Sequence, residues 1–130
     1  MTNTNQLKSI TDIAPSPKWL LELFQDFFDP CPSNPQFDGL VISWQKRNYC
    51  NPPYSDKIPW IKKAIEESKK GNITVMLLPS ATGAAWYHDL LIPNAEILHF
   101  RGRLQLDNGK HPAYDSMLVI FPASNNMGNV

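Results

Sequence analysis

The feature that most constrains the fold is an almost continuously apolar segment at residues 72–79, with the sequence NITVMLLP. A strand with one face in water alternates apolar and polar side chains, whereas this segment is typical of a strand buried on both faces. A helix is predicted just before it, from Ile58 to about Lys70, and Gly71 is a natural helix end. A buried strand that follows a helix indicates an α/β domain.

Other segments extend this pattern along the chain. Residues 16–27 are predicted to form a helix with Ser16 as N-cap and Pro17 at the first helical position. Residues 81–91 are predicted to form another helix, which ends before Pro93. Short strands are predicted at residues 27–29, 40–42, 49–50, 95–100 and 116–121. Helices that alternate with apolar strands predict a three-layer α/β domain with a largely parallel sheet.

The composition is that of one globular domain. A chain of 130 residues is long enough for one hydrophobic core, and 42% hydrophobic residues exclude a disordered protein. Twelve basic and twelve acidic residues give a net charge of zero, so the chain lacks the overall positive charge of a dedicated nucleic-acid binder. We expect a single domain over residues 1–130, with loose tails at about 1–14 and 123–130.

The cysteines and histidines give no sign of a disulfide framework or a metal site. Cys31 and Cys50 are too few for a disulfide scaffold, and His88, His99 and His111 lack the spacing of metal ligands. No apolar segment approaches membrane-spanning length, and the polar start MTNTNQLKS does not resemble a signal peptide. We therefore expect a soluble cytoplasmic protein that does not contact a membrane.

Residues 49–55, with the sequence YCNPPYS, form the most unusual local feature. Two consecutive prolines directly after a predicted strand stop that strand and fix the backbone beyond it. The carboxyl ends of parallel strands meet at one edge of a sheet, where ligands bind in α/β domains. We therefore expect Asn51, Asp29 and the turn at Pro79 to lie at the same edge.

The chemistry available at this corner suits an amine on an aromatic ring. The lone pair of such an amine is delocalised into the ring, and two neighbouring hydrogen-bond acceptors can localise it on the nitrogen. Asn51 offers its side-chain oxygen, and Pro52 offers a main-chain carbonyl whose direction is restricted by Pro53. Tyr54 offers a face on which a nucleobase can stack. The alternative interpretation is a simple turn followed by a core tyrosine.

The motif Asn51-Pro52-Pro53-Tyr54 resembles the catalytic (D/N/S)-P-P-(Y/F/W) motif of amino-directed DNA methyltransferases. More specifically, the chain resembles the phage-type DNA N6-adenine methyltransferases, the Dam-like family of phages and prophages. The resemblance covers about residues 15–122. The segments that carry it are SPKWLLELF, FDPCPSN, FDGL followed by Trp44, NPPYS followed by IPWIKKA, LLPSAT, Trp86-Tyr87-His88, FRGRL and SMLVIF.

The resemblance implies a Rossmann-like fold that uses S-adenosylmethionine as methyl donor and adenine in DNA as acceptor. It implies a phage or prophage protein that acts in the cytoplasm of its host. By position, the donor-binding residues would be Ser16, Pro17, Asp29, Pro30, Cys31 and, at the ribose or adenine of the donor, Asp38. The catalytic residues would be Asn51, Pro52, Pro53 and Tyr54, with Ser55 beside them on the substrate side.

The chain also departs from the usual methyltransferase pattern. The turn DPCPSN has no glycine, although most of these enzymes have a glycine-rich turn there, and the short region between Asp29 and Asn51 predicts a reduced sheet. Because no separate target-recognition domain is visible, we expect a homodimer or a helper subunit to supply recognition. Arg101 and Arg103 flank a glycine after a strand and are suited to bind phosphate, with a solvated hairpin as the alternative.

Two other functions fit the same sequence. The corner would also suit the side-chain amide of a protein glutamine, as in release-factor methyltransferases. The missing glycine-rich turn would suit a non-catalytic relic that binds DNA or a partner protein.

Overall fold

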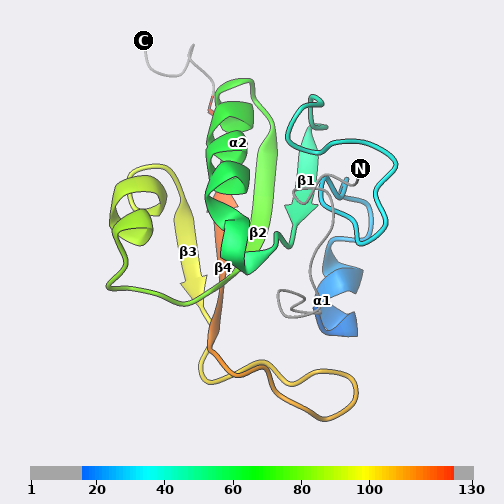
Figure 1. Cartoon of the computed structure of the whole chain (residues 1–130), viewed down its shortest axis with the longest axis vertical. Helices are drawn as coiled ribbons and strands as arrows, with labels where there is room; N and C mark the ends of the chain where they lie inside the picture. The colour runs from blue at the N-terminus through cyan, green and yellow to red at the C-terminus, as the bar shows by residue number, and fades with distance from the viewer. Residues whose placement is uncertain (1–15, 125–130) are drawn as a thin grey trace.

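The computed structural model describes residues 16–124, so the predicted tails lie outside the described residues, apart from residues 123 and 124 (Figure 1). The element bounds agree with the sequence prediction for the second helix and the last strand to within one residue. The elements are α1 (Lys18–Leu23), β1 (Arg47–Cys50), the 3₁₀ helix η2 (Tyr54–Asp56), α2 (Lys57–Lys69), β2 (Ile73–Pro79), the π-helical turn η3 (Tyr87–Leu91), β3 (Glu96–His99) and β4 (Ser116–Phe121).

The four strands form one mixed sheet in the order β1-β2-β4-β3. β1 pairs with β2 in parallel, whereas β4 is antiparallel to both β2 and β3. Three strands therefore run in one direction and β4 alone runs in the other. The prediction of a largely parallel sheet is wrong for the pairing, because the chain returns from β3 directly into β4 and inserts that strand between β2 and β3.

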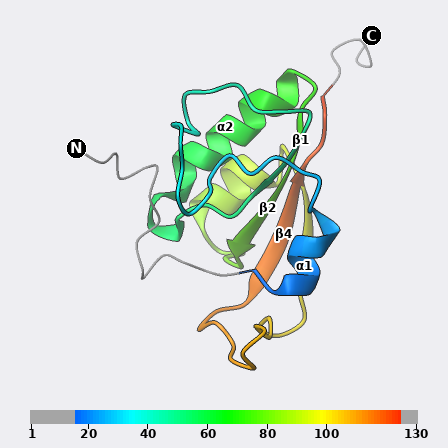
Figure 2. The ribbon, with the colours of Figure 1, turned by 90° about the vertical axis from the view of Figure 1, so that its right-hand side faces the viewer.

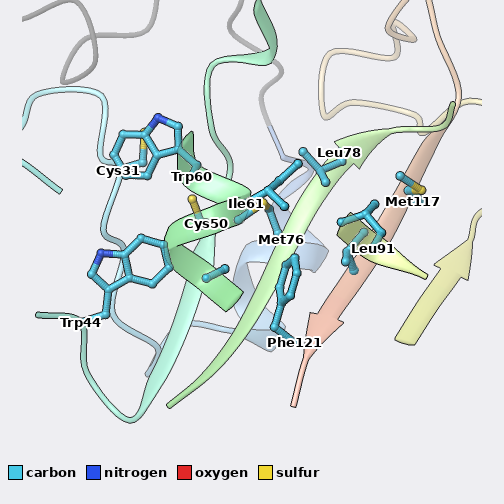
Figure 3. Close-up of a cluster of buried hydrophobic side chains, with 12 residues drawn as sticks. Cys31, Trp44, Cys50, Trp60, Ile61, Met76, Leu78, Leu91, Met117 and Phe121 are labelled. Atoms are coloured by element: carbon cyan, nitrogen blue, oxygen red, sulfur yellow. The ribbon is translucent and has the colours of Figure 1, made fainter. Parts of the chain in front are cut away.

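Helices and loops cover both faces of the sheet (Figure 2). α2 and η3 pack on one face, where Trp60 and Ile61 meet Met76 of β2 and Val119 of β4. Figure 3 shows this cluster, with Trp44 and Cys31 beside Trp60. On the other face, α1 and the loop between β3 and β4 cover the side chains that β2 sends in the opposite direction. Residues of β2 are thus buried on both faces, as predicted.

The first helix is shorter than predicted and is capped differently. It begins at Lys18, and the side chain at its N-cap position, Pro17, makes no capping hydrogen bond. The amide of Lys18 instead donates to the carboxylate of Asp107, 3.1–3.2 Å away. Ser16, the predicted N-cap, forms a 2.9 Å hydrogen bond between its hydroxyl and that of Tyr49. The helix ends at Leu23, because the aromatic residues that follow turn toward β1.

The predicted strands before β1 are almost absent. Residues 40–42 form a turn, in which the carboxylate of Asp38 accepts the amide of Leu40 at 3.0 Å and Val41 is 76% exposed. The segment 27–29 contributes only one parallel bridge, from Phe28 to Asn48. No helix within the described part of the chain is long and apolar enough to span a bilayer.

Gly39 allows the loop before β1 to pack closely on the rest of the domain. A Cβ atom at this position would lie 1.9 Å from the carbonyl oxygen of Pro30 and 2.8 Å from the ring of Trp60. We expect Gly39→Ala to reduce the free energy of unfolding by about 1–3 kcal/mol, as overpacked cores do. Urea denaturation would measure this, with Gly83→Ala as the control because its Cβ would meet no atom within 4 Å. Equal stability of the two variants would contradict this packing.

Candidate functional site

The Asn51-Pro52-Pro53-Tyr54 corner lies at the carboxyl end of β1 and leads directly into η2 and α2. Both prolines are buried, and the carbonyl of Pro53 accepts the amide of Asp56 at 3.1 Å to close the turn. β1, β2 and β3 all end at this edge of the sheet, from which the loop to β4 also leaves (Figure 1). The predicted position of the corner at a strand end is confirmed.

Asp29 lies beside the same strand end. Phe28 donates its amide to the carbonyl of Arg47 and accepts the amide of Tyr49, both at 2.9 Å, so Asp29 follows a segment parallel to β1. The Asp29 side chain is exposed, and its carboxylate accepts the amide of Cys31 at 2.9 Å. Asp29 is therefore adjacent to the corner, as predicted, although its strand is only a bridge.

The other predicted donor-binding residues divide into two groups. Pro30 is buried, and Cys31 is 2% exposed, with its side chain in the hydrophobic core. The carboxylate of Asp38 holds the turn that contains Leu40. Ser16 and Pro17, in contrast, immediately precede α1, where Ser16 is tied to β1 through its hydroxyl.

Tyr49 joins the predicted residues and was missed by the sequence interpretation. Its hydroxyl bonds to Ser16, and its ring stacks on Phe24 with the centroids 5.0 Å apart. Burial raises the pKa of Tyr49 to about 12, and the nearby Cys50 and Asp29 act in the same direction. The sequence signal that could have identified Tyr49 is an aromatic residue just before the corner. The structure places it on the α1 side of the strand.

Tyr54 is covered by Tyr114, which the sequence interpretation also missed. The two rings make an edge contact with centroids 5.4 Å apart and an interplanar angle of 67°. The Tyr54 hydroxyl donates to the carbonyl of Leu77 at 3.3 Å. Burial, followed by the proximity of Tyr114, raises the pKa of Tyr54 well above its ordinary value. Another tyrosine thus contacts the ring on which a base was expected to stack.

The amide oxygen of Asn51 is also covered, with less than 1 Å² of accessible surface. In this conformation the Asn51 oxygen is not accessible to an incoming amine. An open cavity of about 380 Å³ lies near the start of β1. Its lining contains none of the predicted site residues: it consists of Asp26, Phe27, Phe28, Gln45, Lys46 and Arg47.

The predicted substrate-side residues are exposed. Ser55 lies in η2 directly after the corner, and Arg101 and Arg103 lie in the loop between β3 and β4. Arg103 donates to the carbonyl of Pro112 at 3.3 Å, which holds its side chain along that loop. Within residues 16–124, no three histidine, cysteine, aspartate or glutamate side chains gather as metal ligands do.

Comparison with known proteins finds one family. The sequence model of the family described as DNA N-6-adenine-methyltransferase (Dam) matches residues 33–121. The chain is 31% identical to a DNA N-6-adenine-methyltransferase of Haemophilus phage HP1 over 114 residues, which cover 74% of this chain and 65% of that protein. It is 37% identical to a DNA N-6-adenine-methyltransferase of Escherichia phage T1 over 75 residues, which cover 55% of this chain.

The chain spans just under two thirds of the HP1 protein and about one third of the T1 protein, at 65% and 32% of their lengths. No solved structure is significantly similar to it. The matched region includes the corner, α2 and the whole sheet, whereas α1 and Asp29 lie before the residues that the family model matches.

Proposed function

The protein belongs to the DNA N-6-adenine-methyltransferase (Dam) family, and on this premise we propose that it methylates N6 of adenine in DNA with S-adenosylmethionine as donor. The observation that carries the proposal is the Asn51-Pro52-Pro53-Tyr54 corner at the end of β1, with Asp29 beside it. Three strands of one direction, with α2 between β1 and β2, support a reduced Rossmann-like fold.

The surroundings of Asp29 fit a positively charged methyl donor. The exposed carboxylate lies near the ring of Tyr49, and the Phe24 ring stacks on that tyrosine. Carboxylates attract a sulfonium or ammonium group directly, and aromatic rings attract cations through their faces. The residues that would hold the donor are Ser16, Pro17, Asp29, Pro30, the main chain of Cys31 and Asp38.

The corner residues would act on the substrate amine. Asn51, through its side-chain oxygen, and Pro52, through its carbonyl, would accept the two N–H bonds of N6 and localise its lone pair, while Tyr54 would stack on the adenine ring. Methylation would form a C–N bond at N6, and the proton lost from that nitrogen would pass to solvent. S-adenosylmethionine, when bound, would supply the methyl group by cleavage of its S–CH3 bond, which leaves a neutral thioether.

The target base would leave the DNA stack, because enzymes that act on an atom of a base do not reach it inside a duplex. Pro53 would fix the direction of the corner, and Ser55, Arg101 and Arg103 would contact the DNA strand that carries the base. We further propose that the protein acts in the cytoplasm of a phage host. A second copy of the chain or a helper subunit would contribute target recognition.

Mass spectrometry of nucleosides tests the proposal. The purified protein would be incubated with S-adenosylmethionine and DNA that lacks N6-methyladenine, and the DNA would then be digested. We expect N6-methyladenine to accumulate with time and only when the donor is present. Methylation of added cell protein in place of DNA would support a glutamine acceptor instead.

The covered state of Asn51 and Tyr54 favours one alternative, a non-catalytic member of the family that binds DNA. Titration calorimetry with S-adenosylmethionine separates the two functions. An enzyme is expected to bind the donor in the absence of DNA, since Asp29 and Tyr49 are in place before substrate binds. A relic is expected to release or absorb no heat of binding.

A further inference from the structure

The loop of residues 101–115 joins β3 to β4. It contacts both the start of α1 and the Asn51-Pro52-Pro53-Tyr54 corner. Leu104 is buried in the core on the α1 side, and Asp107 accepts the amide of Lys18, the first residue of α1. Tyr114, near the other end of the loop, contacts Tyr54. Figure 1 shows the loop extending beyond the edge at which the parallel strands end. It therefore touches both ends of the proposed active site.

The tip of this loop folds on itself as a compact turn. Leu106 donates its amide to the carbonyl of Lys110 at 2.8 Å, and Gly109 donates its amide to the carbonyl of Leu106 at 2.9 Å. Gly109 adopts a φ of +81°, which favours glycine. His111 adds a 3.1 Å hydrogen bond between its ring nitrogen and the carbonyl of Leu104. Because these contacts hold residues 104–111 together, we expect the segment to move as one unit.

The loop carries a small excess of positive charge, with three cations against the carboxylates of Asp107 and Asp115. Arg101, Arg103 and Lys110 are exposed, and no carboxylate within residues 16–124 forms an ion pair with them. Asp107, the one acidic residue between positions 101 and 111, already accepts the α1 amide. Lys63 of α2 differs, since it pairs with Glu67 at 3.2 Å.

We propose that this loop senses DNA: phosphates bind its three cations, and the resulting movement takes Tyr114 away from Tyr54 so that the target base can stack there. The inference rests on the proposed function and extends it to how the site opens. A base that stacks on Tyr54 would replace a smaller ring contact with a larger one. Arginine and lysine are the side chains that hold DNA phosphates. The covered corner is then the DNA-free state of the enzyme.

The phosphate contact is tested by DNA binding of a triple variant, Arg101→Gln, Arg103→Gln and Lys110→Gln. The control variant also replaces three cations with glutamine, at the exposed lysines Lys46, Lys62 and Lys69, so that its change in net charge is the same. Fluorescence anisotropy with a labelled adenine-containing duplex would be measured between about 50 and 200 mM salt. We expect the loop variant to reduce the slope of log affinity against log salt by about 0.9 for each lost contact. Equal slopes for the loop variant and the control would overturn the contact.

The movement of Tyr114 is tested by Tyr114→Ala, with Tyr114→Phe as the control that keeps the ring. With the corner already uncovered, we expect the alanine variant to lower KM for DNA several-fold without lowering kcat. A purely structural tyrosine would instead raise KM in step with a lower melting temperature, and that result would refute the opening. If wild-type protein binds DNA but forms no N6-methyladenine, the proposed function fails, whereas the salt comparison still tests the loop contact.

Discussion

Asn51→Ala is expected to reduce the rate of adenine methylation by at least about 100-fold, the scale seen when one preorganised polar group is removed from a catalytic site. The variant keeps Pro52 as one acceptor but loses the amide oxygen, so the lone pair of N6 stays delocalised into the ring. Single-turnover assays with labelled donor would measure the loss, because they isolate the chemical step from product release.

Donor binding and folding are the controls for this variant. The proposed donor contacts come from α1 and the turn after Phe28, so calorimetry should show nearly the same affinity for S-adenosylmethionine in Asn51→Ala and in the wild type. Asn94→Ala should retain activity, because Asn94 is remote from the corner. Its side chain donates to the carbonyl of Leu90. Normal methylation by Asn51→Ala at wild-type melting temperature would remove the corner from the mechanism.

Local patterns were sufficient to predict the parts of the fold with continuous sequence signals. The apolar residues of β2 and β4 predicted their strands, and the apolar face of α2 with Gly71 after it predicted that helix. The same reasoning placed Asn51 at a strand end. It failed at residues 40–42, because three apolar residues in a row are too few to distinguish a strand from a turn held by Asp38.

The covered state of the site could not be predicted in this way, because long-range contacts create it. Asp107 caps α1 from 89 positions away, and Ser16 reaches Tyr49 across 33 positions. Tyr114 contacts Tyr54 only because β4 lies between β2 and β3. The loop that precedes β4 therefore lies at the edge of the sheet where β1 ends. Sequence identifies the groups that suit an amine, whereas the topology decides which side chain covers them.

Glu67 shows a second structural role that no local motif predicts. This carboxylate is fully buried at the end of α2, where it accepts the amide of Trp44 at 3.3 Å and the side chain of Asn72 at 2.7 Å. Lys63 and Lys70 supply positive charge at 3.2 and 3.4 Å. The arrangement fixes the segment before β1 to the helix that follows the corner.

Glu67→Ala is expected to reduce the free energy of unfolding by about 3–5 kcal/mol, since removing one partner of a buried ion pair leaves the other charge and the amides uncompensated. Glu66→Ala is the matched control on the same helix. Its carboxylate is 63% exposed and lies 3.8 Å from Lys70, so its loss should change stability by less than about 0.5 kcal/mol. Chemical denaturation at neutral pH would measure both variants, and a similar loss in each would show that Glu67 has no special role.

The stabilisation by Glu67 should also depend on pH. Burial alone would raise the pKa of Glu67, but hydrogen bonds from Asn72 and Lys63, with the charges of both lysines, hold it below its ordinary value of 4.5. Because the folded state favours the ionised form, this stabilisation is complete above the unfolded pKa and is lost as the pH falls through the folded one. The difference in unfolding free energy between wild type and Glu67→Ala should therefore be constant near neutrality and shrink in acid below about pH 4.5. A difference that stays constant throughout the acid range would mean that Glu67 stabilises the fold through packing and not through its charge.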